Sequence, residues 1–254
     1  RAVACQANLR QWGVLLAVYV NENGGRLPAP PPEDADSLHK DWMGWFSGGW
    51  AWGAGWEPDP YDKAKDIRCC PMATKPVNPA GVWGQGQGGT FLAWGRFWPE
   101  GQESTPVPGW SPYGSYGVNH CVSHHWYYPN GEMRTRAWPT ADVSGAAGIP
   151  VYVDNTSPWI AAWQWDMPPV EPEPPASDAI PIGSDSTAHM SPCIDRHDGG
   201  INAVFLDWSA RKVGLKELWT LKWNRKFSTA GKWTKAGGVQ PEDWPQWMRG
   251  FKDY

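Results

Sequence analysis

His197 and Asp207 are the residues whose types and spacing could most readily do chemistry, because nine residues separate an imidazole from a carboxylate. An imidazole oriented by a carboxylate can act as a general base, but that role also needs a pocket and a reacting partner. No nucleophile motif such as G-x-S-x-G or H-E-x-x-H accompanies the pair. We therefore expect Asp207 to lie across the end of a hairpin from His197 and to fix the turn by a hydrogen bond.

A second group of side chains offers nitrogen and sulfur ligands within a short stretch of the chain. It consists of His120, Cys121, His124 and His125. Zinc binds such ligands, but the flanking residues are typical of a strand and the spacing matches no common zinc motif. We do not expect zinc to bind there.

Five cysteines are present, which is an odd number. The adjacent Cys69 and Cys70 seldom bond to each other because disulfide geometry disfavours it. One of them could pair with Cys5, Cys121 or Cys193, and the sequence does not choose among these partners. Such pairing would indicate an oxidising or cell-envelope location.

Two elements must position these residues. Apolar residues at alternating spacings of four and three predict an amphipathic helix, which ends near the glycines at 24–25, and its stripe is Cys5, Leu9, Trp12, Leu16 and Tyr19. The β-prone run at 201–206 predicts a strand that returns as a second strand at 210–213. Together they favour a helix packed on a sheet.

The segment at 196–209 resembles the H-x9-DG signature of planctomycete-type pseudopilins, which are pilin-like proteins of type II secretion and related systems. Further segments follow the order of that family, namely 4–13 and 19–28 as the distal half of a pilin helix with its exit loop, 70–73, and strands at 115–119 and 151–154. The family's usual glycine after the hairpin aspartate is here Trp208. Because tryptophan does not readily adopt positive φ, we expect a wider turn.

The resemblance implies one pilin-like α+β domain over 1–254, in which an N-terminal amphipathic helix packs on an antiparallel β-sheet with long Trp/Gly/Pro-rich loops. Its parts would be a helix at 1–23, a Trp-rich loop region at 24–110, a sheet at 111–213 with a Pro-rich connector at 168–175, and a short helix with an aromatic tail at 214–254. A pilin-like protein should also begin with about 20 apolar residues. We expect contact with a membrane only through such a segment, which this sequence lacks.

The resemblance also implies a function, that of a structural subunit in an extracellular or periplasmic pilus-like or pseudopilus-like filament. The partners would be further copies of the chain in a helical homopolymer, together with other pilins, and no enzymatic activity is expected. Related pseudopilins use calcium to order a loop, and calcium prefers oxygen ligands. The calcium candidates are Asp195, Asp198, Asn202, Asp207 and Asp154. The alternative is that these side chains cap turns or are solvated.

Tryptophan is the compositional outlier, with 21 residues. The rings could pack irregular loops, form contacts between subunits, or stack on sugars as in a secreted carbohydrate-binding module. The second interpretation places at the interface Trp12, Trp219, Trp223, Trp244, Trp247 and Phe251. The third provides the main alternative function, glycan binding. The third candidate function is that of a hydrolase. A glycoside hydrolase needs two carboxylates across a cleft, but with 26 acidic residues some pair is always available and none is informative by itself.

Charge gives a final constraint. The net charge of −4 and the absence of a nucleic-acid motif provide no case for a nucleic-acid partner. Acidic residues gather between positions 33 and 66, whereas basic residues gather between 211 and 235. Opposite patches could dock head to tail in a helical polymer, or they could meet within one subunit.

Overall fold

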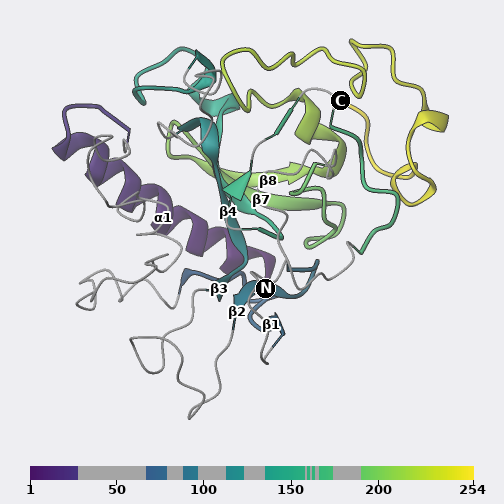
Figure 1. The fold of residues 1–254 in the computed structure, drawn as a ribbon, viewed down its shortest axis with the longest axis horizontal. Helices are drawn as coiled ribbons and strands as arrows, with labels where there is room; N and C mark the ends of the chain where they lie inside the picture. The colour runs from purple at the N-terminus through teal and green to yellow at the C-terminus, as the bar shows by residue number, and fades with distance from the viewer. Residues whose placement is uncertain are drawn as a thin grey trace.

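A five-stranded sheet forms the centre of the computed structural model (Figure 1), with strand order β6-β4-β5-β7-β8. The neighbours β4, β5, β7 and β8 pair antiparallel, and the short β6 pairs parallel to β4. Their bounds are β4 Tyr116–Asn119, β5 Pro150–Asp154, β6 Trp159–Ile160, β7 Gly200–Phe205 and β8 Ala210–Gly214. The four longer strands confirm those predicted from the sequence.

The structure describes residues 1–27, 67–78, 88–96, 113–122, 135–157, 159–160, 162–163, 166–173 and 190–254. A small second sheet joins β1 Pro76–Asn78, β2 Ala93–Arg96 and β3 Tyr113–Gly114. Short 3-10 helices are η2 His120–Val122, η3 Ala146–Gly148, η4 Leu215–Thr220, η5 Pro241–Asp243 and η6 Gln246–Met248. No helix within these ranges is long and apolar enough to cross a bilayer.

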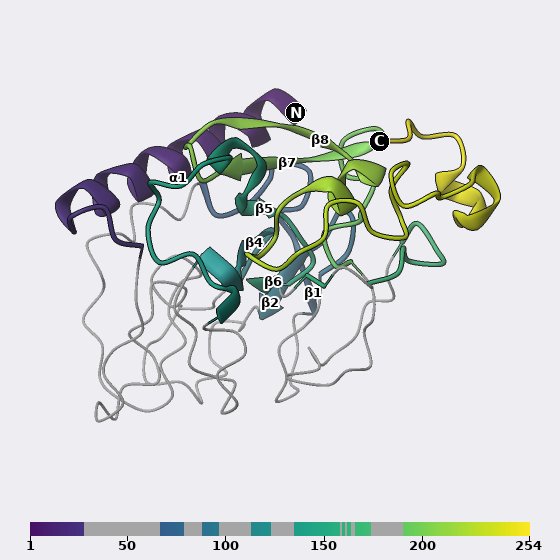
Figure 2. The same ribbon diagram turned by 90° about the horizontal axis from the view of Figure 1, so that it is seen from above.

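Helix α1, Ala2–Glu22, confirms the predicted N-terminal helix and lies along one face of the sheet (Figure 2). Its buried stripe packs against Tyr152, Val204 and Leu206, and the stripe consists of Cys5, Leu9, Trp12, Gly13, Leu16 and Val20. A Cβ placed on Gly13 would lie 2.9 Å from the Val204 side chain and 3.1 Å from the Trp208 carbonyl oxygen. The missing side chain therefore lets α1 approach β7 closely.

The turn between β7 and β8 differs from the expectation for the conformation of Trp208. The Trp208 amide donates to the Phe205 carbonyl at 2.8 Å, and the Phe205 amide donates to the Ser209 carbonyl at 2.9 Å. These bonds close a three-residue hairpin loop, and Trp208 takes the left-handed conformation with φ 66°. The tryptophan thus adopts the backbone geometry that glycine would favour, so the premise that Trp208 would avoid positive φ was wrong. The loop is nevertheless one residue longer than a two-residue primed turn.

The opposite face of the sheet is covered by the C-terminal region. Trp219, Trp233 and Trp244 form a triangle there, with ring centroids 5.3 to 6.4 Å apart. The C-terminal tail folds back on its own subunit. The Lys235 amide donates to the Tyr254 carbonyl at 2.8 Å, and the buried Lys216 ammonium contacts Asp253 at 2.7 Å. The aromatic tail therefore packs within its own subunit.

The residues expected at a subunit interface are mostly core residues. Trp12, Trp219, Trp223 and Trp244 are all 2% exposed or less, and Trp247 and Phe251 are partly buried against the same core. Three of these indole N–H groups have backbone acceptors, since Trp12 donates to the Ile67 carbonyl at 2.9 Å, Trp219 to the Asp166 carbonyl at 2.8 Å and Trp223 to the Leu218 carbonyl at 2.7 Å. The buried Trp244 N–H has no acceptor among the described residues. The C-terminal rings among them pack irregular chain, which agrees with the first of the three interpretations, whereas Trp12 packs α1 against the sheet.

The close approach at Gly13 gives a first prediction. We expect Gly13→Val to lower the free energy of unfolding by about 1–3 kcal/mol, because the added methyl groups must displace β7 or the turn. Urea unfolding followed by tryptophan fluorescence measures the change. Val14→Ala, at the exposed neighbouring position, is the matched control and should change the free energy by less than about 0.5 kcal/mol. Equal effects of the two substitutions would contradict the close packing.

A second prediction concerns Asp166, whose carbonyl accepts the Trp219 indole N–H at 2.8 Å. Burial raises the pKa of its carboxyl to about 7, only partly opposed by the bond from the Trp163 amide. The folded state therefore holds this proton more tightly than the unfolded state, so stability should fall as the pH rises from about 4 to about 7. Asp166→Asn keeps an acceptor for the amide and should flatten that slope and raise stability at pH 8.

Urea unfolding at pH 4.5 and pH 8 checks this expectation. Asp243→Asn changes an exposed carboxylate that accepts a similar bond from the Gln240 amide, at 2.8 Å, and is the matched control. An Asp166→Asn protein with the pH slope of the wild type would count against the assignment.

Candidate metal centre

Asp154 ends β5 and is fully buried, so its charge needs partners from within the protein. The guanidinium of Arg196 contacts one carboxylate oxygen at 3.0 Å, and the Asn202 amide donates to the other at 2.8 Å. Arg196 is itself buried and also donates to the four backbone carbonyls of Gly89, Thr90, Ser115 and Asn155. This set of bonds joins β5, β7 and the 88–96 segment around one ion pair.

His197 contacts the same carboxylate and not the predicted partner. Its Nε2 lies 3.1 Å from Oδ2 of Asp154. Asp207 instead accepts from the amide and hydroxyl of Ser209 within its own turn. The six residues of β7 separate His197 from Asp207 by roughly 20 Å, because a strand rises about 3.3 Å per residue. The expected bond across the hairpin was therefore wrong: the two residues lie at opposite ends of the strand.

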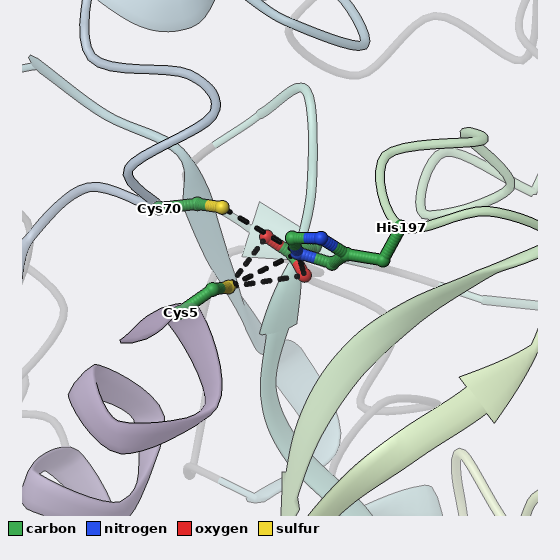
Figure 3. A group of neighbouring side chains, drawn as sticks. Cys5, Cys70 and His197 are labelled. Atoms are coloured by element: carbon green, nitrogen blue, oxygen red, sulfur yellow. Dashed lines mark hydrogen bonds and ion pairs between the residues drawn. The ribbon is translucent and has the colours of Figure 1, made fainter. Parts of the chain in front are cut away.

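Two cysteines complete the group (Figure 3). Cys5 extends from the first turns of α1 and Cys70 from the segment before β1, and both thiols point toward the His197 ring. Their Sγ atoms lie 3.2 Å and 3.4 Å from its Nε2. The ligand atoms of Cys5, Cys70, Asp154 and His197 all lie within 4.8 Å of one another, and all four residues are buried. We call these four residues the four-ligand cluster.

The sulfur atoms also have polar neighbours outside the cluster. The Tyr116 hydroxyl donates to the Cys5 sulfur at 3.3 Å, and the Met72 amide donates to the Cys70 sulfur at 3.5 Å. Each sulfur is thus placed where it can accept a hydrogen bond. Bonds of this kind orient thiolate ligands and tune the metals that they bind.

Burial and charge set the protonation states of the metal-free cluster. Burial raises the pKa of the Cys5 thiol far above its usual range, and the Asp154 charge adds to the effect. Burial also opposes the charged form of His197, but its bonds to Asp154 and Cys5 outweigh this and raise the pKa to about 9. The pKa of Asp154 is lowered in spite of burial, because His197 and Arg196 stabilise the carboxylate. The metal-free group is therefore a protonated imidazole beside a carboxylate and a neutral Cys5 thiol.

The arrangement does not match a nucleophilic Cys-His-Asp triad. Such a triad orients the imidazole by one ring nitrogen and activates the nucleophile with the other. Here both sulfurs and the carboxylate approach the same nitrogen, Nε2. Burial of all four residues also leaves a substrate no access to them. Ligation of a metal ion is the chemistry that suits four ligand atoms facing one point.

The five calcium candidates are not gathered in one place. Asp195 accepts the Gly199 amide at 2.6 Å and so caps its own turn, and the Asn202 side chain donates to the Ala2 carbonyl at 3.3 Å. Asp198 is an exposed residue before β7, and Asp207 lies beyond the other end of that strand. Asp154 alone joins the cluster. The turn-cap alternative thus describes Asp195 and Asp207.

The other ligand expectations have mixed outcomes. The His120 side chain, His124 and His125 lie outside the described residues, while Cys121 is a buried free thiol. All five cysteines are free, so none of the disulfides considered from the sequence is formed. Asp154 and His197 were separate candidates from the sequence, and neither was expected to meet Cys5 or Cys70. The one available signal was that 4–13, 70–73, 151–154 and 196–209 were already singled out as motif segments.

The buried ion pair gives a third prediction. Arg196→Met should lower the free energy of unfolding by about 3–5 kcal/mol, because it leaves the Asp154 carboxylate without its guanidinium partner. Arg211→Met removes the half-exposed arginine that pairs with Glu217 at 2.7 Å and should cost about 1 kcal/mol or less. Urea unfolding of both variants at pH 7 measures the two costs. Similar small losses would show that the Asp154 charge does not depend on Arg196.

No protein-family model, curated protein or solved structure matches this chain.

Proposed function

We propose that this protein is a pilin-like structural subunit that assembles with further copies of itself into an extracellular or periplasmic filament. The α+β architecture, with the N-terminal helix packed on an antiparallel sheet, is the arrangement that the pseudopilin resemblance implies. The observation that carries the proposal is the outer face of α1. This face exposes three valines where a surface helix is normally polar, although the exposed Arg10 and Asn21 lie on the same face.

Val3, Val14 and Val18 are 79%, 63% and 51% exposed, and they are the most exposed large apolar residues of α1. At 100° per residue the three fall within about 60° of one another, so they form one stripe, with the exposed Ala7 between Val3 and Val14. The buried stripe that holds α1 to the sheet faces the other way. A second element could therefore pack on the valines without disturbing the subunit.

The occupant that fits this stripe is the same helix of another subunit. Arg10 and Glu22 are the only charged residues of α1, so two such helices meet with little electrostatic repulsion. In a helical polymer the stripe of one subunit would pack on a different side of α1 in the next subunit, because a contact of the stripe with its own copy has two-fold symmetry and closes after two subunits. The expected contacts with other pilins would use the same stripe.

The alternative functions receive less support. Glycan binding by aromatic stacking needs exposed rings, yet every tryptophan side chain that the structure describes is buried or partly buried. A hydrolase would need accessible carboxylates, and the cluster around Asp154 is closed. The proposed docking of acidic on basic patches stays a prediction, because positions 33–66 lie outside the described residues. Calcium as a cofactor and the envelope location likewise stay predictions.

The valine stripe gives a fourth prediction. Filaments isolated from cells that make the protein should be visible by negative-stain electron microscopy. The triple variant Val3→Asp, Val14→Asp, Val18→Asp should abolish them, because three carboxylates would be buried at each helix contact. Its folding should be unchanged, since all three positions are exposed in the subunit.

Val170→Asp is the matched control, because Val170 is 68% exposed but lies outside α1. Circular dichroism of both variants establishes that they are folded. Filaments in the folded triple variant, or single particles in the wild type, would contradict the proposal.

A further inference from the structure

We propose that the four-ligand cluster is a structural zinc site, in which Zn2+ is held by the sulfurs of Cys5 and Cys70, a carboxylate oxygen of Asp154 and Nε2 of His197. This inference does not depend on the filament proposal, because it concerns the interior of one subunit. It rests on the distances between the ligand atoms, on the hydrogen bonds to the sulfurs and on the balance of buried charge.

Four of the six distances between the ligand atoms are close to the edges of a zinc tetrahedron, and all six are within 4.8 Å. With Zn–N and Zn–O bonds of about 2.0–2.1 Å and Zn–S bonds of about 2.3 Å, the edges from the nitrogen would be roughly 3.3–3.6 Å. The distances from Nε2 of His197 are 3.1 Å to Asp154, 3.2 Å to Cys5 and 3.4 Å to Cys70. The Cys5 sulfur lies 3.5 Å from the carboxylate oxygens, where the tetrahedral edge is about 3.6 Å. Outward shifts of roughly a few tenths of an ångström would admit the ion.

Hydrogen bonds alone do not account for this convergence. A ring nitrogen carries at most one proton, so Nε2 of His197 can donate to only one of its three neighbours. Thiols are weak hydrogen-bond donors, and the Cys5 and Cys70 thiols are buried against a carboxylate and an imidazole that already bind one another. A cation at the centre interacts favourably with all four ligand atoms at once.

Buried charge balances when zinc is present. Zinc binds thiolates, so the two cysteines and Asp154 contribute three negative charges, while His197 binds as the neutral imidazole. The ion and the fully buried Arg196 guanidinium supply three positive charges. The site is then neutral in a region where an unbalanced charge is costly. The Tyr116 hydroxyl and the Met72 amide, which already point at the sulfurs, stabilise the thiolates.

The ligand types select zinc over the calcium considered from the sequence. Calcium takes six to eight oxygen ligands, whereas two sulfurs, one nitrogen and one oxygen suit a tetrahedral, borderline-soft ion. All four positions are filled by protein and the residues are buried, so no ligand position is open to water or substrate. Such a closed site contributes to folding rather than to catalysis. It would join α1, the segment before β1, the end of β5 and the loop before β7.

The test begins with the metal content of the purified chain of residues 1–254, prepared with free thiols and without chelators. Mass spectrometry of the metals should give about one zinc per chain. Cys5→Ser and Cys70→Ser should each reduce the zinc content at least roughly tenfold. Cys69→Ser should retain the ion, because Cys69 neighbours Cys70 in the chain but is not part of the cluster. Zinc retained by the Cys5→Ser or Cys70→Ser protein would overturn the assignment.

A second measurement covers the case in which a ligand variant fails to fold. Wild-type protein freed of metal under reducing conditions should bind one Co2+, with the intense visible bands of tetrahedral cobalt and a sulfur-to-cobalt charge-transfer band. Tyr116→Phe, which removes the hydroxyl that lies 3.3 Å from both the sulfur and the carbonyl oxygen of Cys5, should weaken Zn2+ affinity roughly 10-fold.

Thiol counting accompanies both measurements. A reduced, folded protein that binds neither Zn2+ nor Co2+ would overturn the proposal. So would a native protein that holds a Cys5–Cys70 disulfide and still fails to bind metal after reduction.

Discussion

The buried carboxylate of Asp154 is the constraint on which the rest of the structure depends. A charge at this depth is tolerated only when donors surround it, and the fold brings these donors from Arg196, His197 and the Asn202 amide. Arg196 then fixes the 88–96 segment and the Ser115 carbonyl through its remaining N–H groups. One ion pair thus connects the end of β5, the loop before β7 and the 88–96 segment.

The same carboxylate is coupled to the position of α1. Cys5 lies in the first turns of the helix and contacts Asp154 and His197, while Gly13 lets the middle of the helix rest on Val204. One contact is polar and fixes where the helix begins on the sheet, and the other is steric and fixes how close it comes. A helix held at two such points, about 12 Å apart at 1.5 Å per residue, has little freedom to slide or tilt.

Local patterns predicted the helix and the strands, because periodicity reports which face of an element is buried. The cluster was not predictable in this way, since its residues lie at positions 5, 70, 154 and 197 and meet only after the sheet has formed. The predicted bond between His197 and Asp207 failed because the two residues lie at opposite ends of β7 and are not neighbours in space. Trp208 has positive φ against its usual backbone preference, because its position in the turn requires that conformation. The C-terminal tail shows no periodic pattern of apolar residues, because tryptophan packing and not regular secondary structure holds it in place.

The two proposals meet in α1, which would have a different task on each face. Assembly through Val3, Val14 and Val18 would transmit mechanical force to α1, and the buried stripe would pass this force to the sheet. Val3 lies only two residues from Cys5 in the chain, so a metal ligand at Cys5 would anchor the end of the helix next to this contact. Hydrophobic packing resists separation but allows sliding, whereas coordination bonds are directional and fix one position. A zinc site at Cys5 would therefore make the N-terminal end of α1, next to the proposed filament contact, more rigid.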